Sequence, residues 1–212
     1  YADWTASGRS YTPIENHIYN NVLPFYANTH TTMSVTGRTI SHFREEARDL
    51  IRKSVNASKE KDAVIFTGSG TTGAINKLVS VFGLLKYSKG KHVKRDQPVV
   101  FVGPFEHHSN LLPWRESNAE VVNVREGLDG NIDLLHLKEL LLQYRKRPLK
   151  IGSFSYCSNV TGLITNADDV SILLHKHGAF ACWDCAAGAP YLTLNMTPNS
   201  PDKVLAYKDA IM

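Results

Sequence analysis

The stretch IFTGSGTTGAINKL, residues 65–78, joins a short apolar run to a glycine-rich loop and the start of a helix-like segment. The apolar run, residues 63–66, has the composition of a β-strand, and Gly68, Gly70 and Gly73 follow it. A strand, a glycine loop and a helix in this order usually hold a phosphate, because backbone N–H groups and the positive end of the helix dipole meet there. The stretch therefore predicts an α/β fold with an anion site at this turn.

The remaining sequence alternates between strand-like and helix-like segments. Helices are expected over residues 38–56, 72–85, 109–116, 132–147 and 167–178, and strands over 63–66, 98–102, 119–124, 149–155, 179–183 and from 207 onward. Strands separated by helices predict a mainly parallel sheet with helices on both faces. We divide the chain into an N-terminal arm, residues 1–35, which is mostly loop, and one large domain, residues 36–212.

The composition is that of an ordinary globular protein, with 42% hydrophobic and 21% charged residues in a chain of 212. The net charge is +4, and the one dense basic cluster, residues 86–96, lacks a recognition motif and predicts a solvated loop. No apolar run approaches the about 20 residues that span a bilayer. Three cysteines, an odd number, fit a reducing compartment. We expect a cytoplasmic protein with neither a nucleic-acid nor a membrane partner.

The glycine loop also matches two nucleotide motifs. GSGTTG fits the dinucleotide pattern G-x-G-x-x-G, but the acid that should follow about 20 residues later is missing, and the first one is Asp96. An ATP-binding P-loop would need Lys and Ser or Thr where Ala74 and Ile75 stand. An NAD-binding domain, or a turn that binds no ligand, remains an alternative.

Polar residues follow four of the predicted strands, where the chemistry of a parallel sheet is found. These segments are residues 68–72, 106–110, 156–162 and Asp184. A carboxylate at the end of the apolar run AFACWD is costly unless a cation or several donors meet it, and a protonated ring nitrogen would do so. His107 offers a flat ring for stacking, and Asn159 offers an amide for a phenolic oxygen. A phosphate, a pyridinium ring and a phenol together describe pyridoxal 5'-phosphate (PLP).

These segments resemble the class V aminotransferase family of PLP-dependent enzymes, in particular its cysteine desulfurase and selenocysteine lyase branch. The similar stretches, in the family's order, are YANTHT, FTGSGTTGAINKL, EHHSNLLPW, SNVTG and WDCAAGAP. The resemblance implies the large domain of the fold type I PLP-dependent transferases. It also implies cofactor contacts from Gly70, Thr71 and Thr72 to the phosphate, His107 to the ring, Asn159 to the phenolic oxygen and Asp184 to the ring nitrogen, with Asn28 and His30 on the substrate side.

Two positions depart from the family pattern. Ala187 stands where the family usually has Gln. The Schiff-base lysine of the family follows an aspartate like Asp209 in the pattern S-x-H-K, and no lysine follows Asp209 before the sequence ends at Met212. Lys208 precedes that aspartate and is a poor substitute. We therefore expect these residues to be the N-terminal and large-domain part of a longer enzyme, inactive alone.

The resemblance implies an amino-acid substrate, cysteine desulfuration with transfer of sulfur to an acceptor protein, and a homodimer. His107 would stack on the cofactor and shuttle a proton. Another class V transferase or lyase reaction, or a non-catalytic binding protein, remains an alternative. Cys182 and Cys185 form C-x-x-C, but zinc needs a second ligand pair, so we expect core cysteines and no metal site.

Overall fold

The computed structural model describes residues 1–85 and 96–212, which form two compact units, Tyr1–Ile65 and Phe66–Met212. Each unit is described by itself. Most of the basic cluster, residues 86–95, lies outside the described residues, so its solvated-loop assignment remains a prediction. The division of the sequence at residue 35 also remains a prediction.

The first unit is helical. It contains α1 (Thr12–His17), η1 (Ile18–Val22), η2 (Leu23–Phe25) and α2 (Val35–Ser54). The N-terminal segment is thus less loop-like than expected, since prolines, tolerated in a first helical turn, stand at the starts of α1 and η2. The Ser34 hydroxyl accepts a hydrogen bond from Gly37 N at 3.1 Å and begins α2.

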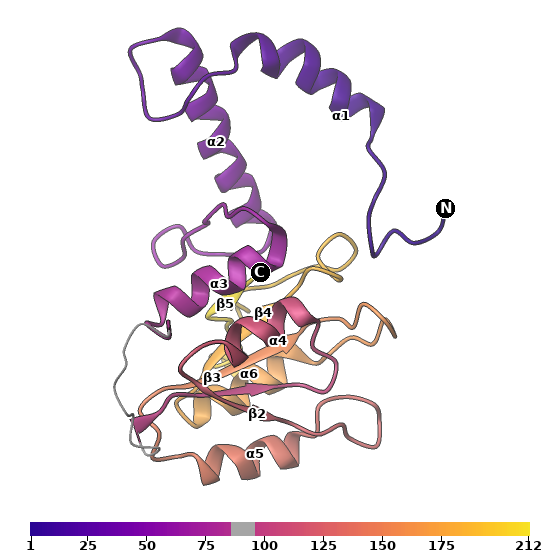
Figure 1. Cartoon of the computed structure of the whole chain (residues 1–212), viewed down its shortest axis with the longest axis vertical. Coiled ribbons are helices and arrows are strands. Elements are labelled where there is room, and N and C mark those ends of the chain that lie inside the picture. The colour runs from indigo at the N-terminus through magenta and orange to yellow at the C-terminus, as the bar shows by residue number, and fades with distance from the viewer. Residues whose placement is uncertain (86–95) are drawn as a thin grey trace. The chain divides into compact units, whose positions relative to one another are not determined.

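The second unit contains a parallel sheet of five strands in the order β2-β1-β3-β4-β5 (Figure 1). The strands are β1 (Val99–Val102), β2 (Glu120–Asn123), β3 (Lys150–Ser155), β4 (Phe180–Asp184) and β5 (Ala210–Ile211). The α/β prediction and these five strands are confirmed. The strand expected at residues 63–66 is wrong: within the described part of the chain this segment pairs with no strand, and Ile65 and Phe66 are exposed.

Four helices cover the two faces of this sheet (Figure 1): α3 (Gly70–Val81), α4 (His108–Arg115), α5 (Leu134–Gln143) and α6 (Ala167–Lys176). On one face Ile75 and Val79 of α3 and Trp114 of α4 pack with Val100 and Ile151 of the sheet. On the other, α6 packs on β4, where the Trp183 indole donates to Ser171 Oγ at 3.1 Å. Buried apolar residues on both sides of a strand are typical of parallel sheets covered by helices.

The strand order reverses between β1 and β3. The chain leaves β1 through α4 toward β2 on one side, and leaves β3 through α6 toward β4 on the other. The loops therefore part at the carboxyl ends of β1 and β3, and such a switch point is where ligands bind in open parallel sheets. Three of the predicted site residues, His107, Asn159 and Asp184, lie at or just beyond the carboxyl ends of β1, β3 and β4.

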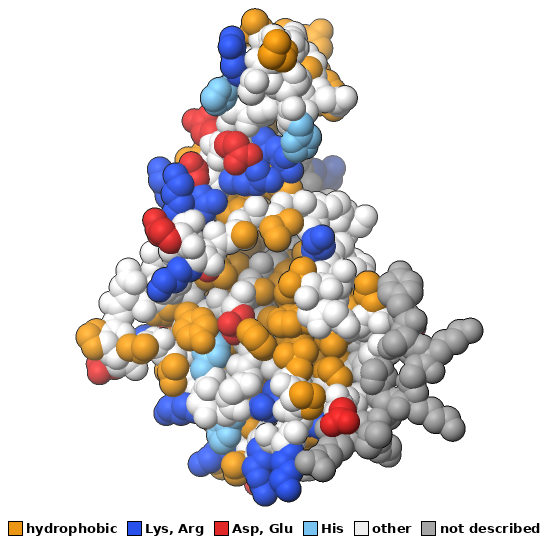
Figure 2. Space-filling view, turned by 90° about the vertical axis from the view of Figure 1, so that its left-hand side faces the viewer, with side chains coloured by type: hydrophobic (Ala, Val, Ile, Leu, Met, Phe, Trp, Pro, Cys, Tyr) orange, Lys and Arg blue, Asp and Glu red, His pale blue; other side chains and the backbone are white. Residues whose placement is uncertain are grey.

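The surface carries hydrophobic as well as charged side chains (Figure 2). Exposed apolar residues of the second unit include Val81, Leu112 and Leu128. Single apolar residues at the surface are ordinary in folded proteins and assign no partner. Among the described helices, none is both long and apolar enough to cross a membrane.

Candidate functional site

The glycine loop forms an open helix N-terminus. Ser69 and Gly70 both have φ near 60°, a left-handed conformation, and α3 begins immediately after this turn. A Cβ at Gly73 would lie 1.8 Å from the Gly68 carbonyl oxygen, so only glycine fits there. The Ser69 side chain makes no capping hydrogen bond. The backbone N–H groups of the first turn, which have no partner inside a helix, are thus available to an anion.

A chain of hydrogen bonds connects this loop to His107. The Thr72 hydroxyl donates to Ser109 Oγ at 2.9 Å, and Ser109 Oγ lies 3.0 Å from His107 Nδ1. The Ser109 backbone N–H also donates to Nδ1, at 3.2 Å, so His107 caps the start of α4. Because Nδ1 accepts, a neutral His107 carries its proton on Nε2. Ring orientation and proton position are both determined by α4.

Asp184, the last residue of β4, is a buried carboxylate with few hydrogen-bond donors to offset the cost of removing its charge from water. The one hydrogen bond that the described residues give its side chain comes from Ala186 N to Oδ1, at 3.0 Å. Burial raises the pKa of Asp184 above its ordinary value, although this hydrogen bond and the nearby His107 oppose the rise. A cationic donor at this position would stabilise the ionised carboxylate.

Asn159 lies in the tight turn that follows β3. The Ser158 hydroxyl accepts from Val160 N at 3.3 Å and Thr161 N at 3.2 Å, and Gly162 closes the turn at φ 73°. Asn159 itself is exposed, and no hydrogen bond within the described residues joins it to His107 or Asp184. The structure thus connects Thr72 with His107 and brings His107 near Asp184, while Asn159 occupies a neighbouring loop.

The model of the family described as Aminotransferase class-V matches residues 1–202. The chain belongs to this family. One relative of this class V aminotransferase is a probable cysteine desulfurase of Staphylococcus aureus, which is 27% identical over 95% of this chain and 47% of its own length. Another is a probable cysteine desulfurase of Halalkalibacterium halodurans, which is 27% identical over 81% of this chain and 40% of its own length. The chain therefore spans about half the length of the curated relatives it matches.

Solved structures show the same fold at lower sequence identity. A cysteine desulfurase from Thermococcus onnurineus superposes with a TM-score of 0.73 at 22% identity, covering 91% of this chain and 45% of that one. A NifS-like protein from Rickettsia africae superposes with a TM-score of 0.74 at 18% identity, and the match covers 98% of this chain and 52% of that one. These likenesses confirm the predicted fold type I large domain and the expectation that the chain matches only part of such proteins.

Lys208 is not available as the class V lysine. Its side chain is buried, and its ammonium donates to Asp168 Oδ1 at 2.5 Å and to the Ala206 carbonyl at 2.9 Å. Asn28 and His30 are exposed residues of the first unit, so the site in the second unit is described without them and their substrate-side role remains a prediction.

The cysteines of the C-x-x-C pair lie in the protein interior, as predicted. Cys182 belongs to the core under α3 and α4, and Cys185 is buried at the end of β4. Burial raises the pKa of both thiols, to about 12 for Cys185, so neither is a thiolate near neutral pH.

One residue beside the site was missed. Glu106 precedes His107, and the sequence assigned it no role. Its carboxylate is half-buried at the switch point and bonded to groups on either side of it. An acid in the loop after the buried strand β1 was the available signal, but its partner Ser155 is 49 positions away.

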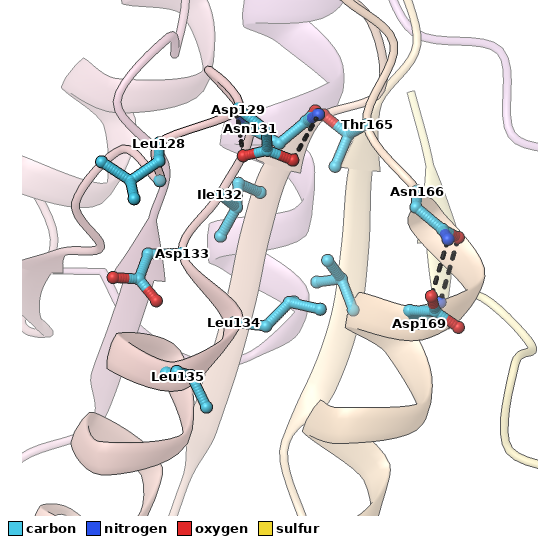
Figure 3. A pocket seen from close by; sticks show the side chains of 12 residues that line it. Leu128, Asp129, Asn131, Ile132, Asp133, Leu134, Leu135, Thr165, Asn166 and Asp169 are labelled. Atoms are coloured by element: carbon cyan, nitrogen blue, oxygen red, sulfur yellow. Dashed lines mark hydrogen bonds between the residues drawn. The ribbon is translucent and has the colours of Figure 1, made fainter.

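A separate pocket of about 550 Å³ lies between the loop before α5 and the start of α6 (Figure 3). Its walls include the carboxylates of Asp129, Asp133 and Asp169. Each is already engaged, Asp129 by Asn131, Asp133 by His136 N and Asp169 by Asn166. Three acids disfavour a phosphate, so the N-terminus of α3 remains the candidate anion site.

Proposed function

We propose that this chain is the cofactor-binding part of a PLP-dependent enzyme that acts on an amino acid, and that its reaction is the desulfuration of cysteine. The observation that carries the proposal is the Asp184 carboxylate, buried at the end of β4 near His107. Such a group needs a cationic partner, and the pyridinium nitrogen of PLP is one.

The residues present fit each part of this cofactor. The uncapped first turn of α3, with the Thr72 hydroxyl beside it, suits the phosphate. His107 offers its ring for stacking and holds a proton at Nε2. Asn159, on the loop after β3, is the donor for the phenolic oxygen. When bound, PLP supplies an electron sink that stabilises negative charge on the substrate; Asp184 strengthens that sink by keeping the ring nitrogen protonated.

The reaction is inferred from relatives named as probable cysteine desulfurases. In this proposal, sulfur leaves the side chain of cysteine and passes to an acceptor protein, the active form is a homodimer, and the Schiff-base lysine and sulfur-accepting cysteine are not among these 212 residues. These residues alone would then bind PLP but would not catalyse the reaction. Another class V reaction at the same site is the second candidate, supported by Ala187 in place of the usual Gln.

Replacement of Asp184 tests the cofactor role. In the natural protein, Asp184→Asn should lower PLP affinity at least tenfold, about 1.4 kcal/mol, because the pyridinium loses its counter-ion. Fold stability should not fall, because a poorly compensated buried charge is removed. Asp202→Asn makes the same change at an exposed position and is the control.

PLP content by absorbance and unfolding by urea measure the two effects. Wild-type cofactor affinity in Asp184→Asn would contradict the pyridinium role. If the natural protein, loaded with PLP, releases no sulfide from cysteine in the presence of a thiol reductant, the desulfurase assignment is contradicted and the second candidate is favoured.

A further inference from the structure

Glu106, a half-buried residue beside the site, accepts four hydrogen bonds, and no part of the proposed chemistry uses it. Its Oε1 accepts from Gly103 N at 3.1 Å and Ser155 N at 3.0 Å. Its Oε2 accepts from Asn110 Nδ2 at 2.5 Å and Ser155 Oγ at 2.9 Å. One carboxylate therefore bonds to the residue after β1, the end of β3 and the first turn of α4.

These partners surround the switch point of the sheet. β1 and β3 are neighbours, and their chains diverge just beyond Val102 and Ser155. Backbone N–H groups at such a divergence lose their ladder partners, and an unpaired buried N–H is costly. The Glu106 carboxylate accepts from the backbone N–H groups of Gly103, after β1, and Ser155, at the end of β3, and so replaces the acceptors that these groups lose where the strands diverge.

The donor set favours the ionised form of Glu106. Gly103, Ser155 and Asn110 together direct four donors at its oxygens. Desolvation raises the pKa of this carboxyl to about 7 even though the four hydrogen bonds oppose the rise. A carboxylate whose hydrogen-bond partners are all donors acts as an acceptor for the surrounding backbone.

Asn110 cannot turn its amide around to suit another partner. Its Oδ1 accepts from Ser153 Oγ at 2.6 Å and from the Trp114 indole at 3.3 Å. Since the oxygen is held by two donors, the NH₂ group must face Glu106. The orientation of the amide, and with it the first turn of α4, is therefore coupled to the acceptor at position 106.

We propose that Glu106 is the positioning residue of the candidate cofactor site: it fixes the first turn of α4 against β3 and thereby sets the place and proton position of the His107 ring. The expected effect of Glu106 on cofactor affinity rests on the proposed function. Glu106 acts through His107 and Ser109, the residues that it holds beside Thr72, and does not itself contact the cofactor.

Exchange of donor and acceptor between positions 106 and 110 tests this. In Glu106→Gln the new NH₂ group faces the NH₂ of Asn110, two donors without an acceptor. In Asn110→Asp two carboxylates face each other. The double variant Glu106→Gln/Asn110→Asp restores a donor–acceptor pair and returns one negative charge, and the new carboxylate at position 110 still accepts from Ser153 and Trp114. Glu139→Gln, on exposed α5 surface, is the control for charge loss.

The first readout needs no cofactor. In ¹⁵N-labelled, cofactor-free protein, the ¹⁵N shift of His107 Nδ1 reports whether that nitrogen accepts from Ser109. Each single variant should move this shift and accelerate amide exchange at Ser109 N, and the double variant should restore both. The second readout is PLP affinity, expected to fall about tenfold in each single variant and to return to within about twofold in the double.

Unchanged ring shifts in the single variants, or a double variant no better than the worse single, would overturn the positioning role. If the single variants fail to fold, a folded double variant with the wild-type ring shift still supports it. Wild-type protein that binds no PLP would refute the proposed function but leave the ring measurement as the test of Glu106.

Discussion

Replacement of Gly73 by alanine should damage the candidate anion site and also lower the stability of the fold. The new Cβ would lie 1.8 Å from the Gly68 carbonyl oxygen, whereas real Cβ contacts essentially never fall below 3.0 Å. The oxygen must therefore retreat by at least 1.2 Å, the difference between these distances. That movement rearranges the loop whose N–H groups bind the phosphate in the proposed function.

The magnitude follows from hydrogen bonds to a charged group, each of which contributes about 1.5–3 kcal/mol. Loss of one such bond lowers affinity at least tenfold. Fold stability should fall as well, because the clash is with backbone and the about 1 kcal/mol of helix propensity that alanine gains over glycine offsets only part of the strain. Gly68→Ala is the matched control, since a Cβ there meets nothing within 4 Å and the backbone is not left-handed.

The assay compares PLP with pyridoxal, which lacks the phosphate, by titration of cofactor-free protein. Gly73→Ala should weaken PLP binding at least tenfold and leave pyridoxal binding unchanged. Equal PLP affinities for Gly73→Ala and Gly68→Ala would refute the assignment of the phosphate to this loop. An equal loss for PLP and pyridoxal would show general damage to the site and refute it as well.

Two further substitutions test the supports of the sheet. Burial lowers the pKa of His175, but hydrogen bonds to Asp209 and a backbone carbonyl outweigh it and raise the pKa above 6.5. Protonated His175 thus stabilises the fold fully below about pH 6.5, and this stabilisation is lost as pH rises through the raised pKa. In urea unfolding, His175→Gln should therefore lower the free energy of unfolding more at about pH 6 than at about pH 9. A loss that does not depend on pH, or the same pH-dependent loss in His177→Gln, would contradict this. Leu174→Ala should cost about 2–5 kcal/mol. Gly152→Ala, whose Cβ would lie 2.6 Å from a Leu174 methyl and 2.7 Å from Phe154 Cε2, should cost less in the Leu174→Ala background than in wild type, because only the Phe154 contact then remains. Additive losses in urea unfolding would refute this coupling.

The centre of the sheet was predictable because β1, β3 and β4 are short, largely buried runs covered by helices, and such runs stand out between polar loops. The segment at residues 63–66 shows the limit of that signal. Its residues are as apolar as those of β1, but a strand also needs a neighbour to pair with. Within the described residues this segment forms no strand, and Ile65 and Phe66 are exposed.

The candidate site was predictable in part for a similar reason. His107 and Asp184 each lie at the end of a confirmed strand or in the loop after it, and parallel strands end at one edge. Thr72 was found from the glycine-rich turn, although the strand predicted before it is wrong. Glu106 was not predictable, because its role arises from Ser155 and from backbone groups freed where β1 and β3 diverge. Strand order creates that site, and no local pattern in the sequence reveals the order.

The most direct test of the account maps ligand contacts on the cofactor-free protein by NMR. Pyridoxamine phosphate carries the same ring and phosphate as PLP and forms no covalent bond with lysine, so it reports the non-covalent site alone. We expect shift changes at the backbone amides of Gly70–Thr72, at the His107 ring and at Asp184. Changes confined to the pocket lined by Asp129 and Asp169, or no changes at a millimolar excess, would contradict the central claim.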